Sequence, residues 1–436
     1  ADLADLQALV RWAAEGGHAL VPRGAGSAIG GGNVGPGVVV DLTALAPAVL
    51  EVDPATRTAR TSAGVTHREL SVAASRYGLR LPPDPSSSGW VTLGGMLATN
   101  AAGARSVRYG ATRRWVLEAT AVTADGEVAR LARGEAGADT AALARFHQET
   151  APAILAARDE VARHFPRTAK NTSGYALDAW LASGDDLDLL IGSEGTLALV
   201  TEITWQLDPI PPVRRSILVE APSLDRLGTL IVALRAESPS ALELLDRTFL
   251  DVVRQDPPAG MTVPAAETVV LVEMEGTAAE VAGGLARIEA AVERLGGRAA
   301  VARTRDEETA IWALRHAASP ILARLPETRR SMQLVEDGCV PLDRLGDYIR
   351  LLREAAARRE LPIVLFGHAG DGHVHANLLP DVTARGWEHA VASLYDEVSA
   401  GVLALGGTPA GEHGDGRLRA RLVERLYGPL VMALFR

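Results

Sequence analysis

Cysteine is nearly absent from this chain of 436 residues. Cys339 is the only one, which excludes internal disulfides. It also excludes an iron–sulfur cluster held by this chain alone, since such a cluster needs about four thiolates. No stretch approaches about 18 consecutive apolar residues, so we expect no membrane span.

The chain also lacks a basic tract, and its formal net charge is −10. We therefore expect no nucleic-acid partner. The acidic first residues, 1–14, lack the basic start of a signal peptide, so we expect a cytoplasmic protein, at most peripheral to a membrane. An anionic substrate would be repelled by the overall field and would need a local arginine to receive it.

Lysine is as scarce as cysteine. Lys170 is the only lysine, although lysine and arginine together number 44. A chain so biased towards arginine should have lost a lysine that merely lay on the surface. Two interpretations stay open: chance survival, or a position that requires a compact ammonium group instead of a planar guanidinium.

The length and the 47% hydrophobic content indicate a globular protein of two or three domains. Clustered prolines at 208–212 form the best linker candidate. We predict a first domain over 1–207, a second over 208–410, and a C-terminal segment, 411–436, that returns to the first. After the linker, strand-like runs, including 334–340, alternate with helical ones, which suits a sheet covered on one face by helices.

A glycine-rich loop spans 22–36, after a predicted helix over 2–14 and a short apolar run at 19–21. A dinucleotide-binding fingerprint would require a helix directly after the glycines. Here a strand at 38–42 follows instead. A glycine loop between two strands can still bind phosphate, because successive backbone N–H groups form an anion-binding concavity.

Three further segments combine glycine with small hydroxyl residues, at 82–103, 170–177 and 192–202. Glycine and small side chains let the backbone approach a flat ligand closely. In this order and spacing, the four segments resemble the FAD-binding domain of the vanillyl-alcohol oxidase and p-cresol methylhydroxylase superfamily. The resemblance implies an α+β fold, with a two-part FAD-binding domain and an α+β cap domain that contains an antiparallel sheet.

The resemblance also implies the residues that contact FAD: the first loop would wrap the pyrophosphate, and the other segments would line the path from adenine to flavin. These residues are Arg23, Gly24, Ala25, Gly26, Ser27, Asp84, Pro85, Ser86, Ser88, Gly94, Gly95, Thr99, Asn100, Gly103, Gly195 and Val200. Some relatives attach the flavin through a histidine in the first loop. Residues 22–33 contain no histidine, so we expect FAD to bind without a covalent link.

Histidines gather in the segment F-G-H-A-G-D-G-H-V-H-A-N, residues 366–377. Gly370-Asp371-Gly372 has tight-turn composition, which predicts a hairpin of strands 363–368 and 373–378. Strand alternation then places His373, His375 and Asn377 on one face, which His368 can meet. Two imidazoles and a carboxylate would suit zinc, manganese, iron or cobalt; lone histidines, in contrast, are usually structural.

These motifs, with G-E-H-G-D-G at 411–416, resemble the D-lactate, glycolate and D-2-hydroxyglutarate dehydrogenase branch of the same superfamily. Matched position by position, His368, His375 and Glu412 correspond to the metal ligands, with zinc the first choice. The other matches are His413 to the catalytic base, Asn377 to a substrate contact, and Arg315 to the catalytic arginine that binds the substrate carboxylate.

The resemblance therefore implies oxidation of a D-2-hydroxy acid. Arg315 would hold the carboxylate, the metal would bind the substrate, His413 would take the hydroxyl proton and FAD would accept the hydride. At 334–341 the chain carries Glu336-Asp337 and no lysine, unlike some D-2-hydroxyglutarate dehydrogenases, which argues against a dicarboxylate substrate. The same segment looks more like long bacterial members that fuse the flavin part to an iron–sulfur domain.

The electron acceptor would accordingly be separate: an iron–sulfur domain or carrier, a quinone or an electron-transfer flavoprotein. A homodimer is compatible with these features. The alternatives are an oxygen-using oxidase of the aldonolactone or sugar type, the non-redox ether-lipid synthase of the superfamily, and a scaffold flavin subunit of a larger complex. Metal content, turnover of 2-hydroxy acids and yellow colour would distinguish them.

Overall fold

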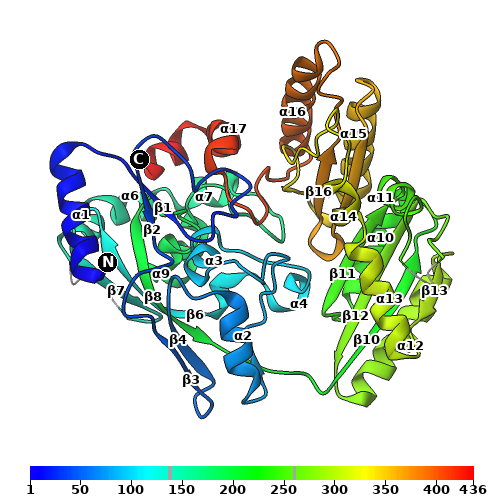
Figure 1. The fold of residues 1–436 in the computed structure, drawn as a ribbon, viewed down its shortest axis with the longest axis horizontal. Coiled ribbons are helices and arrows are strands. Elements are labelled where there is room, and N and C mark those ends of the chain that lie inside the picture. The colour runs from blue at the N-terminus through cyan, green and yellow to red at the C-terminus, as the bar shows by residue number, and fades with distance from the viewer. Residues whose placement is uncertain (136–139, 259–261) are drawn as a thin grey trace.

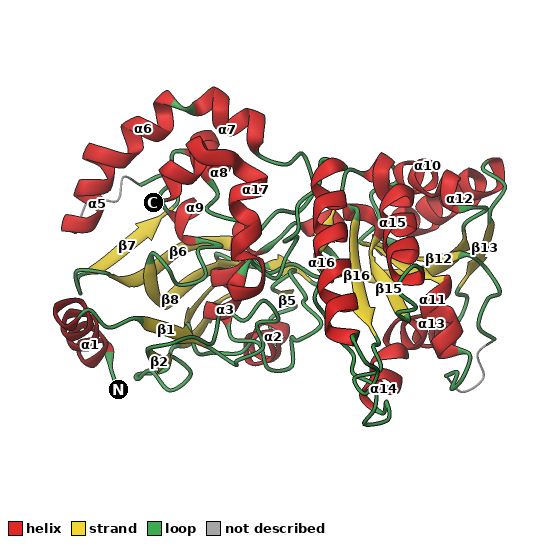
Figure 2. Cartoon of the chain, turned by 90° about the horizontal axis from the view of Figure 1, so that it is seen from above, coloured by secondary structure: helices red, strands yellow, loops and turns green. Residues whose placement is uncertain are grey.

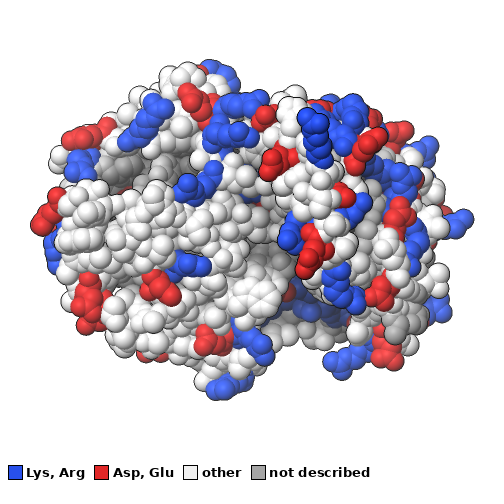
Figure 3. All heavy atoms as spheres, turned by 45° about the horizontal axis from the view of Figure 1, so that its top comes forward, with Lys and Arg blue, Asp and Glu red and all other residues white. Residues whose placement is uncertain are grey.

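The computed structural model describes residues 1–135, 140–258 and 262–436. These form two lobes joined by the chain that leaves β8 (Ala198–Gln206) and enters β10 (Val213–Glu220), as Figure 1 shows. None of the described helices is both long enough and apolar enough to cross a membrane. On the face shown in Figure 3, acidic and basic side chains are interspersed, and no continuous basic stripe crosses it.

The first lobe contains a five-stranded antiparallel sheet in the order β3–β4–β8–β6–β7. Besides β8 its strands are β3 (Leu50–Asp53), β4 (Thr58–Ser62), β6 (Val116–Thr123) and β7 (Val128–Ala132). Trp205 of β8 is fully buried, and its indole N–H donates to Thr61 Oγ1 at 2.9 Å. Helices α2 (His67–Ser75) and α3 (Leu93–Thr99) contribute Leu70 and Leu93 to the same core.

The glycine-rich loop connects two strands, as predicted. Helix α1 (Leu3–Gly16) ends at Gly17, which has a φ of 64°, and β1 (Leu20–Arg23) follows. The loop then leads into β2 (Val38–Asp41), which pairs with β1 in parallel. No helix begins directly after the glycines, so the backbone of this loop remains available to a ligand.

The second lobe contains a seven-stranded antiparallel sheet in the order β13–β10–β12–β11–β15–β16–β14. Its further strands are β11 (Ala241–Asp246), β12 (Thr268–Gly276), β13 (Arg298–Val301), β14 (Gly338–Cys339), β15 (Ile363–His368) and β16 (His373–Leu378). One face packs against α10 (Leu224–Arg235), α12 (Ala278–Arg294), α15 (Leu345–Ala357) and α16 (Trp387–Ala404). This face is apolar along every long strand.

Two predictions about this lobe are wrong, and the first concerns the opposite face of the sheet. It is not bare: α11 (Arg247–Val253), α13 (Arg305–His316) and α14 (Ala318–Ala323) cover its apolar part, so helices flank the sheet on both sides. The strand predicted over 334–340 shrinks to β14, because Glu336 and Asp337 lie in a turn where their buried side chains bind neighbouring segments.

The C-terminal helix α17 (Gly416–Phe435) lies against the first lobe. Its Val423, Tyr427 and Val431 share a core with Ile154 and Trp180. Figure 2 shows α17 grouped with α6 (Ala151–Ala156), α7 (Arg158–His164) and α8 (Leu177–Ser183) on one side of this lobe. The segment that precedes α17 therefore passes from the second lobe to the first, between them.

Short elements complete the fold: α4 (Ser106–Tyr109), α5 (Ala141–Arg145), α9 (Leu187–Leu190), β5 (Leu79–Arg80) and β9 (Asp208–Pro209). Two arginines from this part of the first lobe bind carboxylates of β12 in the second. Arg105 donates through Nε and Nη2 to Glu273, at 2.8 and 2.9 Å, and Arg80 Nη2 lies 3.0 Å from Glu275 Oε2. Both glutamates are buried, so these pairs fix how the lobes meet.

Candidate active site

A cavity of about 980 Å³ runs between the two lobes. On the first lobe it is lined by the glycine-rich segments, and all the predicted FAD contacts except Asn100 border it. Asn100 caps α3, and its side-chain oxygen accepts a hydrogen bond from the Arg113 backbone N–H at 2.9 Å. The second lobe contributes Arg315, His368 and His375, and the C-terminal segment Glu412 and His413.

Two glycines show why the first-lobe wall needs residues without side chains. A Cβ at Gly94 would lie 2.7 Å from the Cβ of Ala63. Gly195 has a φ of +76°, and a Cβ there would lie 2.2 Å from Cγ of Pro22. Side chains at these positions would force the segments apart, whereas glycine lets them form a close backbone cradle that fits a flat cofactor with a pyrophosphate.

The predicted hairpin is confirmed. β15 pairs with β16 so that His368 lies opposite His373, and Phe366 opposite His375. Gly372, with a φ of 71°, closes the turn between the strands. Period-two alternation then brings the three histidines to one face of the sheet, and that face points into the region between the lobes.

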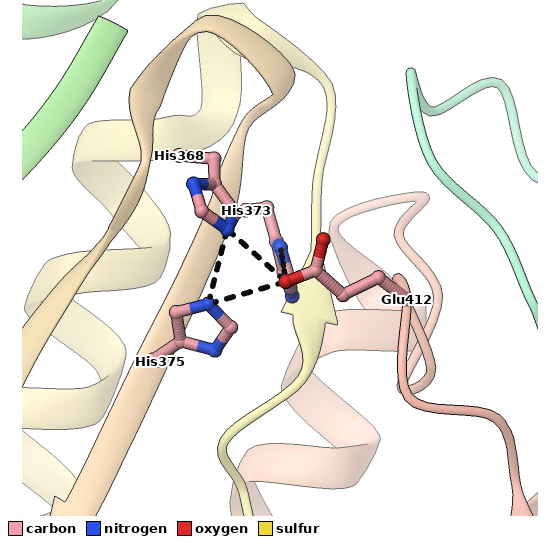
Figure 4. Close-up of side chains that lie close together, drawn as sticks. All are labelled: His368, His373, His375 and Glu412. Atoms are coloured by element: carbon pink, nitrogen blue, oxygen red, sulfur yellow. Dashed lines mark hydrogen bonds and ion pairs between the residues drawn. The ribbon is translucent and has the colours of Figure 1, made fainter. Parts of the chain in front are cut away.

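Glu412 completes a compact cluster with these histidines (Figure 4). Its Oε1 lies 3.1 Å from His368 Nε2, 3.5 Å from His375 Nε2 and 3.8 Å from His373 Nδ1. The two Nε2 atoms of His368 and His375 are 3.4 Å apart. Imidazole nitrogens and a carboxylate oxygen converging at such distances form a donor set that fits a first-row divalent metal.

The outer nitrogen of each clustered histidine is held by an acceptor. His368 Nδ1 contacts Glu243 Oε1 at 2.5 Å, His375 Nδ1 contacts the Glu336 carbonyl at 2.8 Å, and His373 Nε2 contacts Asp337 Oδ1 at 2.9 Å. Such outer contacts commonly orient metal-binding histidines and fix which nitrogen carries the proton. Burial and the neighbouring His375 lower the pKa of His373 to about 4, so its ring is neutral.

Lys170 holds the other oxygen of Glu412. Its Nζ lies 2.7 Å from Glu412 Oε2 and 3.3 Å from Asp371 Oδ2, and its side chain is only 4% exposed. Burial alone would raise the pKa of Glu412, but Lys170 and His368 keep it well below its usual range. The only lysine in the chain thus lies beside the histidine cluster, where its ammonium group meets two carboxylates.

His413 lies at the edge of the cluster and is 27% exposed on the cavity side. Its Nδ1 contacts Glu336 Oε2 at 2.8 Å, which leaves Nε2 as the other ring nitrogen, 3.8 Å from Glu412 Oε1. Burial would lower the pKa of His413, but Glu336 and Asp337 outweigh it and raise this pKa to about 10. The carboxylates alone would therefore keep His413 protonated at neutral pH.

Arg315, on α13, reaches the same cavity from the second lobe. Its Nε donates to Glu243 Oε2 at 2.7 Å, and its guanidinium lies 4.7 Å from the centre of the Phe366 ring. Burial would raise the pKa of Glu243, but His368 and Arg315 together lower it to about 2. Glu243 is thus an ionised bridge between the predicted carboxylate-binding arginine and a predicted metal ligand.

Sequence reasoning missed Glu243 as part of the site and treated Glu336-Asp337 only as a departure from relatives. A signal was available: these acidic residues interrupt two mostly apolar segments, A-L-E-L-L-D and L-V-E-D-G-C-V. Carboxylates are rarely buried unless they are paired. The Asp337 carboxylate accepts hydrogen bonds from the backbone N–H groups of Glu412 and His413, at 3.1 and 3.0 Å, and so positions these two residues.

Asn377 takes a less exposed position than predicted for a substrate contact. It is buried on β16 and does not border the cavity. Within the described part of the chain, its side-chain oxygen has no hydrogen-bond partner. Its assignment to the substrate stays a prediction.

Residues 210–436 match the C-terminal domain of FAD-linked oxidases, and residues 1–132 match an FAD-binding domain. The first of these matches covers more than half of the chain. The chain belongs to the FAD-linked oxidase family.

The chain is similar over nearly its whole length to several curated proteins. It is 30% identical to glycolate oxidase subunit GlcD of Bacillus subtilis, over 93% of this chain and 77% of the relative. It is 29% identical to D-lactate dehydrogenase of Archaeoglobus fulgidus, over 97% and 83%. D-2-hydroxyglutarate dehydrogenase of Escherichia coli is 28% identical, and the match spans 99% of this chain but only 45% of that protein.

Solved structures support the fold. The 4-ethylphenol oxidase from Gulosibacter chungangensis superposes with a TM-score of 0.69 at 16% identity, over 99% of this chain and 83% of that one. For p-cresol methylhydroxylase the TM-score is 0.68 at 15% identity, with the same coverage. The predicted fold, an FAD-binding domain of this superfamily with an α+β cap, is confirmed.

Proposed function

We propose that this member of the FAD-linked oxidase family is a dehydrogenase that converts a D-2-hydroxy acid to the 2-oxo acid. One observation carries the proposal: a single cavity connects the FAD cradle to Arg315, His413 and the histidine cluster. The names of the relatives support the substrate class, since they include glycolate oxidase, D-lactate dehydrogenase and D-2-hydroxyglutarate dehydrogenase. When bound, FAD supplies the acceptor for the hydride that leaves C2 of the substrate, which no protein side chain can accept.

Arg315 would bind the substrate carboxylate. Among the described residues only its Nε donates to a side chain, namely to Glu243, so the two Nη groups remain for a ligand. Stacking on Phe366 and the contact with Glu243 restrict the guanidinium to one orientation. A planar fork held in this way binds a carboxylate through two hydrogen bonds and fixes which face of C2 points towards the flavin.

His413 would take the proton from the substrate hydroxyl. Glu336 holds Nδ1, so Nε2 is the nitrogen that can accept a proton. Glu336 and Asp337 raise the pKa of His413, so the ring can be neutral at neutral pH only if a nearby positive charge opposes these two carboxylates. A divalent cation beside His413 would oppose their field and lower that pKa towards neutrality.

The residues that would hold the metal are His368, His375 and Glu412. Their nitrogen and oxygen donors converge, and their outer contacts fix the orientation of each. A divalent metal at this position supplies Lewis acidity towards the substrate hydroxyl. Zinc, manganese, iron and cobalt all accept such ligands.

The electron acceptor is proposed to be separate, because the chain has one cysteine, Cys339, and this thiol is buried. We accordingly expect faster turnover with an artificial dye than with oxygen. Peroxide formation as fast as dye reduction would favour the oxygen-using oxidase instead.

Anaerobic mixing of the yellow holoenzyme with a panel of D- and L-2-hydroxy acids tests the proposed reaction. We expect bleaching of the flavin by D-2-hydroxy monocarboxylates, much slower bleaching by their L enantiomers, and weak reaction with D-2-hydroxyglutarate. Absence of bleaching by every D-2-hydroxy acid would refute the proposed function.

A further inference from the structure

We propose that His373 Nδ1 is a fourth protein ligand of the metal, beside His368, His375 and Glu412. The inference rests on the metal site of the proposed function and goes beyond it, because the resemblance assigned only those three ligands. It changes the number of coordination positions that the protein itself fills.

Four of the six separations between the donor atoms lie close to those expected around one ion. Bonds of about 2.0–2.2 Å in a tetrahedral site place ligand atoms about 3.3–3.6 Å apart. The observed separations are 3.1 Å for Glu412 to His368, 3.4 Å for His368 to His375, and 3.5 Å for Glu412 to His375. His373 Nδ1 lies 3.8 Å from Glu412, and one donor atom from each of the four residues lies within 4.8 Å of the other three.

His373 Nδ1 is also a buried atom that lacks a partner within the described residues. The Nε2 of the same ring donates to Asp337 Oδ1 at 2.9 Å. A neutral imidazole that donates through Nε2 carries its lone pair on Nδ1. That lone pair therefore faces Glu412 and the other two histidines, and no hydrogen-bond donor among the described residues reaches it. A metal ligand needs this arrangement.

All three histidines then follow one rule: one nitrogen faces the centre and the other is held by an oxygen. For His368 the outer acceptor is Glu243, for His375 the Glu336 carbonyl, and for His373 Asp337. A histidine that only filled space would not need an oriented outer contact matching that of its two neighbours. The repeated pattern argues that His373 has the same role as His368 and His375.

His373 lies on the same strand as His375 and could instead be considered as the base, but its burial conflicts with that role. Its side chain is 0% exposed and does not border the cavity, so a substrate cannot reach it. His413 borders the cavity and is 27% exposed. The two histidines therefore have different roles: His413 faces the substrate and His373 faces the metal.

A fourth protein ligand would also limit which metal can bind both the protein and the substrate. Three imidazoles and one carboxylate would fill every position of a tetrahedral ion. Space for substrate oxygens would then require a metal that accepts five or six ligands, which manganese, iron and cobalt do more readily than zinc.

Cobalt(II) binding to the FAD-loaded, metal-free protein tests the proposal. Affinity would be measured by competition with a chelator, and coordination by the visible ligand-field spectrum. We would compare wild type with His373→Gln, His368→Gln and His375→Gln, and use His389→Gln, an exposed histidine of α16 in the same lobe, as the matched control. FAD content and circular dichroism would show that each variant is folded.

We expect His373→Gln to weaken cobalt binding by more than about 100-fold, beyond the 10–100-fold typical of an outer contact. It should also change the ligand-field spectrum, as should the other two cluster variants, whereas His389→Gln should match wild type. If His373→Gln binds cobalt with the wild-type affinity and spectrum while His368→Gln and His375→Gln lose it, the fourth ligand is refuted and the proposed function stands. Retention of cobalt by all three variants would refute the metal site itself.

A crystal structure of the cobalt-loaded wild-type protein gives a second test that needs no variant. An anomalous difference map would locate the ion. We expect it about 2.1 Å from His373 Nδ1, the bond length that imidazole makes to zinc. An ion bonded to His368, His375 and Glu412 but more than about 3 Å from His373 Nδ1 would overturn the proposal.

Discussion

The two walls of the cavity differ in their chemistry. The first-lobe wall consists mainly of backbone, glycine and small hydroxyl residues, such as the stretch from Gly24 to Ser27. The opposite wall carries ionisable side chains that are fixed by one another, among them Arg315, His368 and Glu412. The difference suggests a division of labour, in which backbone groups bind the cofactor and charged side chains act on the substrate. Substitutions on the two walls should therefore have separable effects.

The largest effect is expected at His413. Loss of a general base costs about 10²–10⁴-fold, mostly in kcat. His413→Ala should retain FAD and bind substrate, but its flavin should be reduced that much more slowly in anaerobic stopped-flow experiments. His389→Ala serves as the control. A His413→Ala protein with the wild-type rate of flavin reduction would show that the base lies elsewhere.

Arg315→Ala should weaken substrate recognition and leave FAD binding intact. Losing a paired contact with a carboxylate costs about 2–4 kcal/mol, or roughly 30–1000-fold in kcat/KM. Arg315→Lys should restore only part of this loss, because an ammonium group cannot reproduce the planar fork. Steady-state kinetics with an artificial dye would measure both variants. An unchanged kcat/KM for Arg315→Ala would remove this arginine from the substrate site.

Lys170→Met tests a residue that comes from the first lobe but acts on the second-lobe cluster. Without its ammonium group, Glu412 Oε2 loses its 2.7 Å contact, and the carboxylate is free to rotate. Loss of such an outer contact should weaken metal binding by about 10–100-fold, as measured by chelator competition. Lys170→Arg should not restore it, since a planar guanidinium does not fit the buried position of this ammonium group. Wild-type metal affinity in Lys170→Met would favour chance survival of this lysine.

Gly94→Ala tests the first-lobe wall, where we expect an effect on FAD binding but not on metal binding. The added Cβ of Gly94→Ala would meet Ala63 Cβ at 2.7 Å and push α3 away from the residue that follows β4. Overpacking of this kind costs about 1–3 kcal/mol, and we expect it to weaken FAD binding. Metal affinity should remain at the wild-type value. Fluorescence titration with FAD and chelator competition would measure the two affinities, and a loss of metal without a loss of FAD would contradict the division between the walls.

Local patterns predicted the parts of this structure that depend on few neighbours. The turn at Gly370-Asp371-Gly372 and the period-two histidines predicted the hairpin, and the glycine-rich loop predicted a strand on either side. Residues that meet across long distances in the sequence could not be predicted in this way. Glu243 meets His368 across 125 positions, and Lys170 meets Glu412 across 242. Strand pairing within the second lobe brings the first pair together, and the contact between the first lobe and the C-terminal segment brings the second pair together.

The strand predicted over 334–340 shows what amino-acid composition alone cannot predict. Residues 334–340 are mostly apolar and resemble a buried strand, but only Gly338–Cys339 pairs in the sheet. Glu336 and Asp337 lie in a turn instead, where their side chains bind His413, His373 and Arg419. Buried carboxylates that fix a site can therefore override the strand preference of the residues around them.

The division of labour can be tested most directly by removing the metal from the yellow holoenzyme with a chelator and adding D-lactate without oxygen. We predict that the chelated protein keeps its full FAD content, that its flavin stays oxidised, and that adding manganese or cobalt restores bleaching. Bleaching of the metal-free protein at the rate of the untreated protein would contradict the proposed role of the histidine cluster, because the substrate would then reduce the flavin without a bound metal.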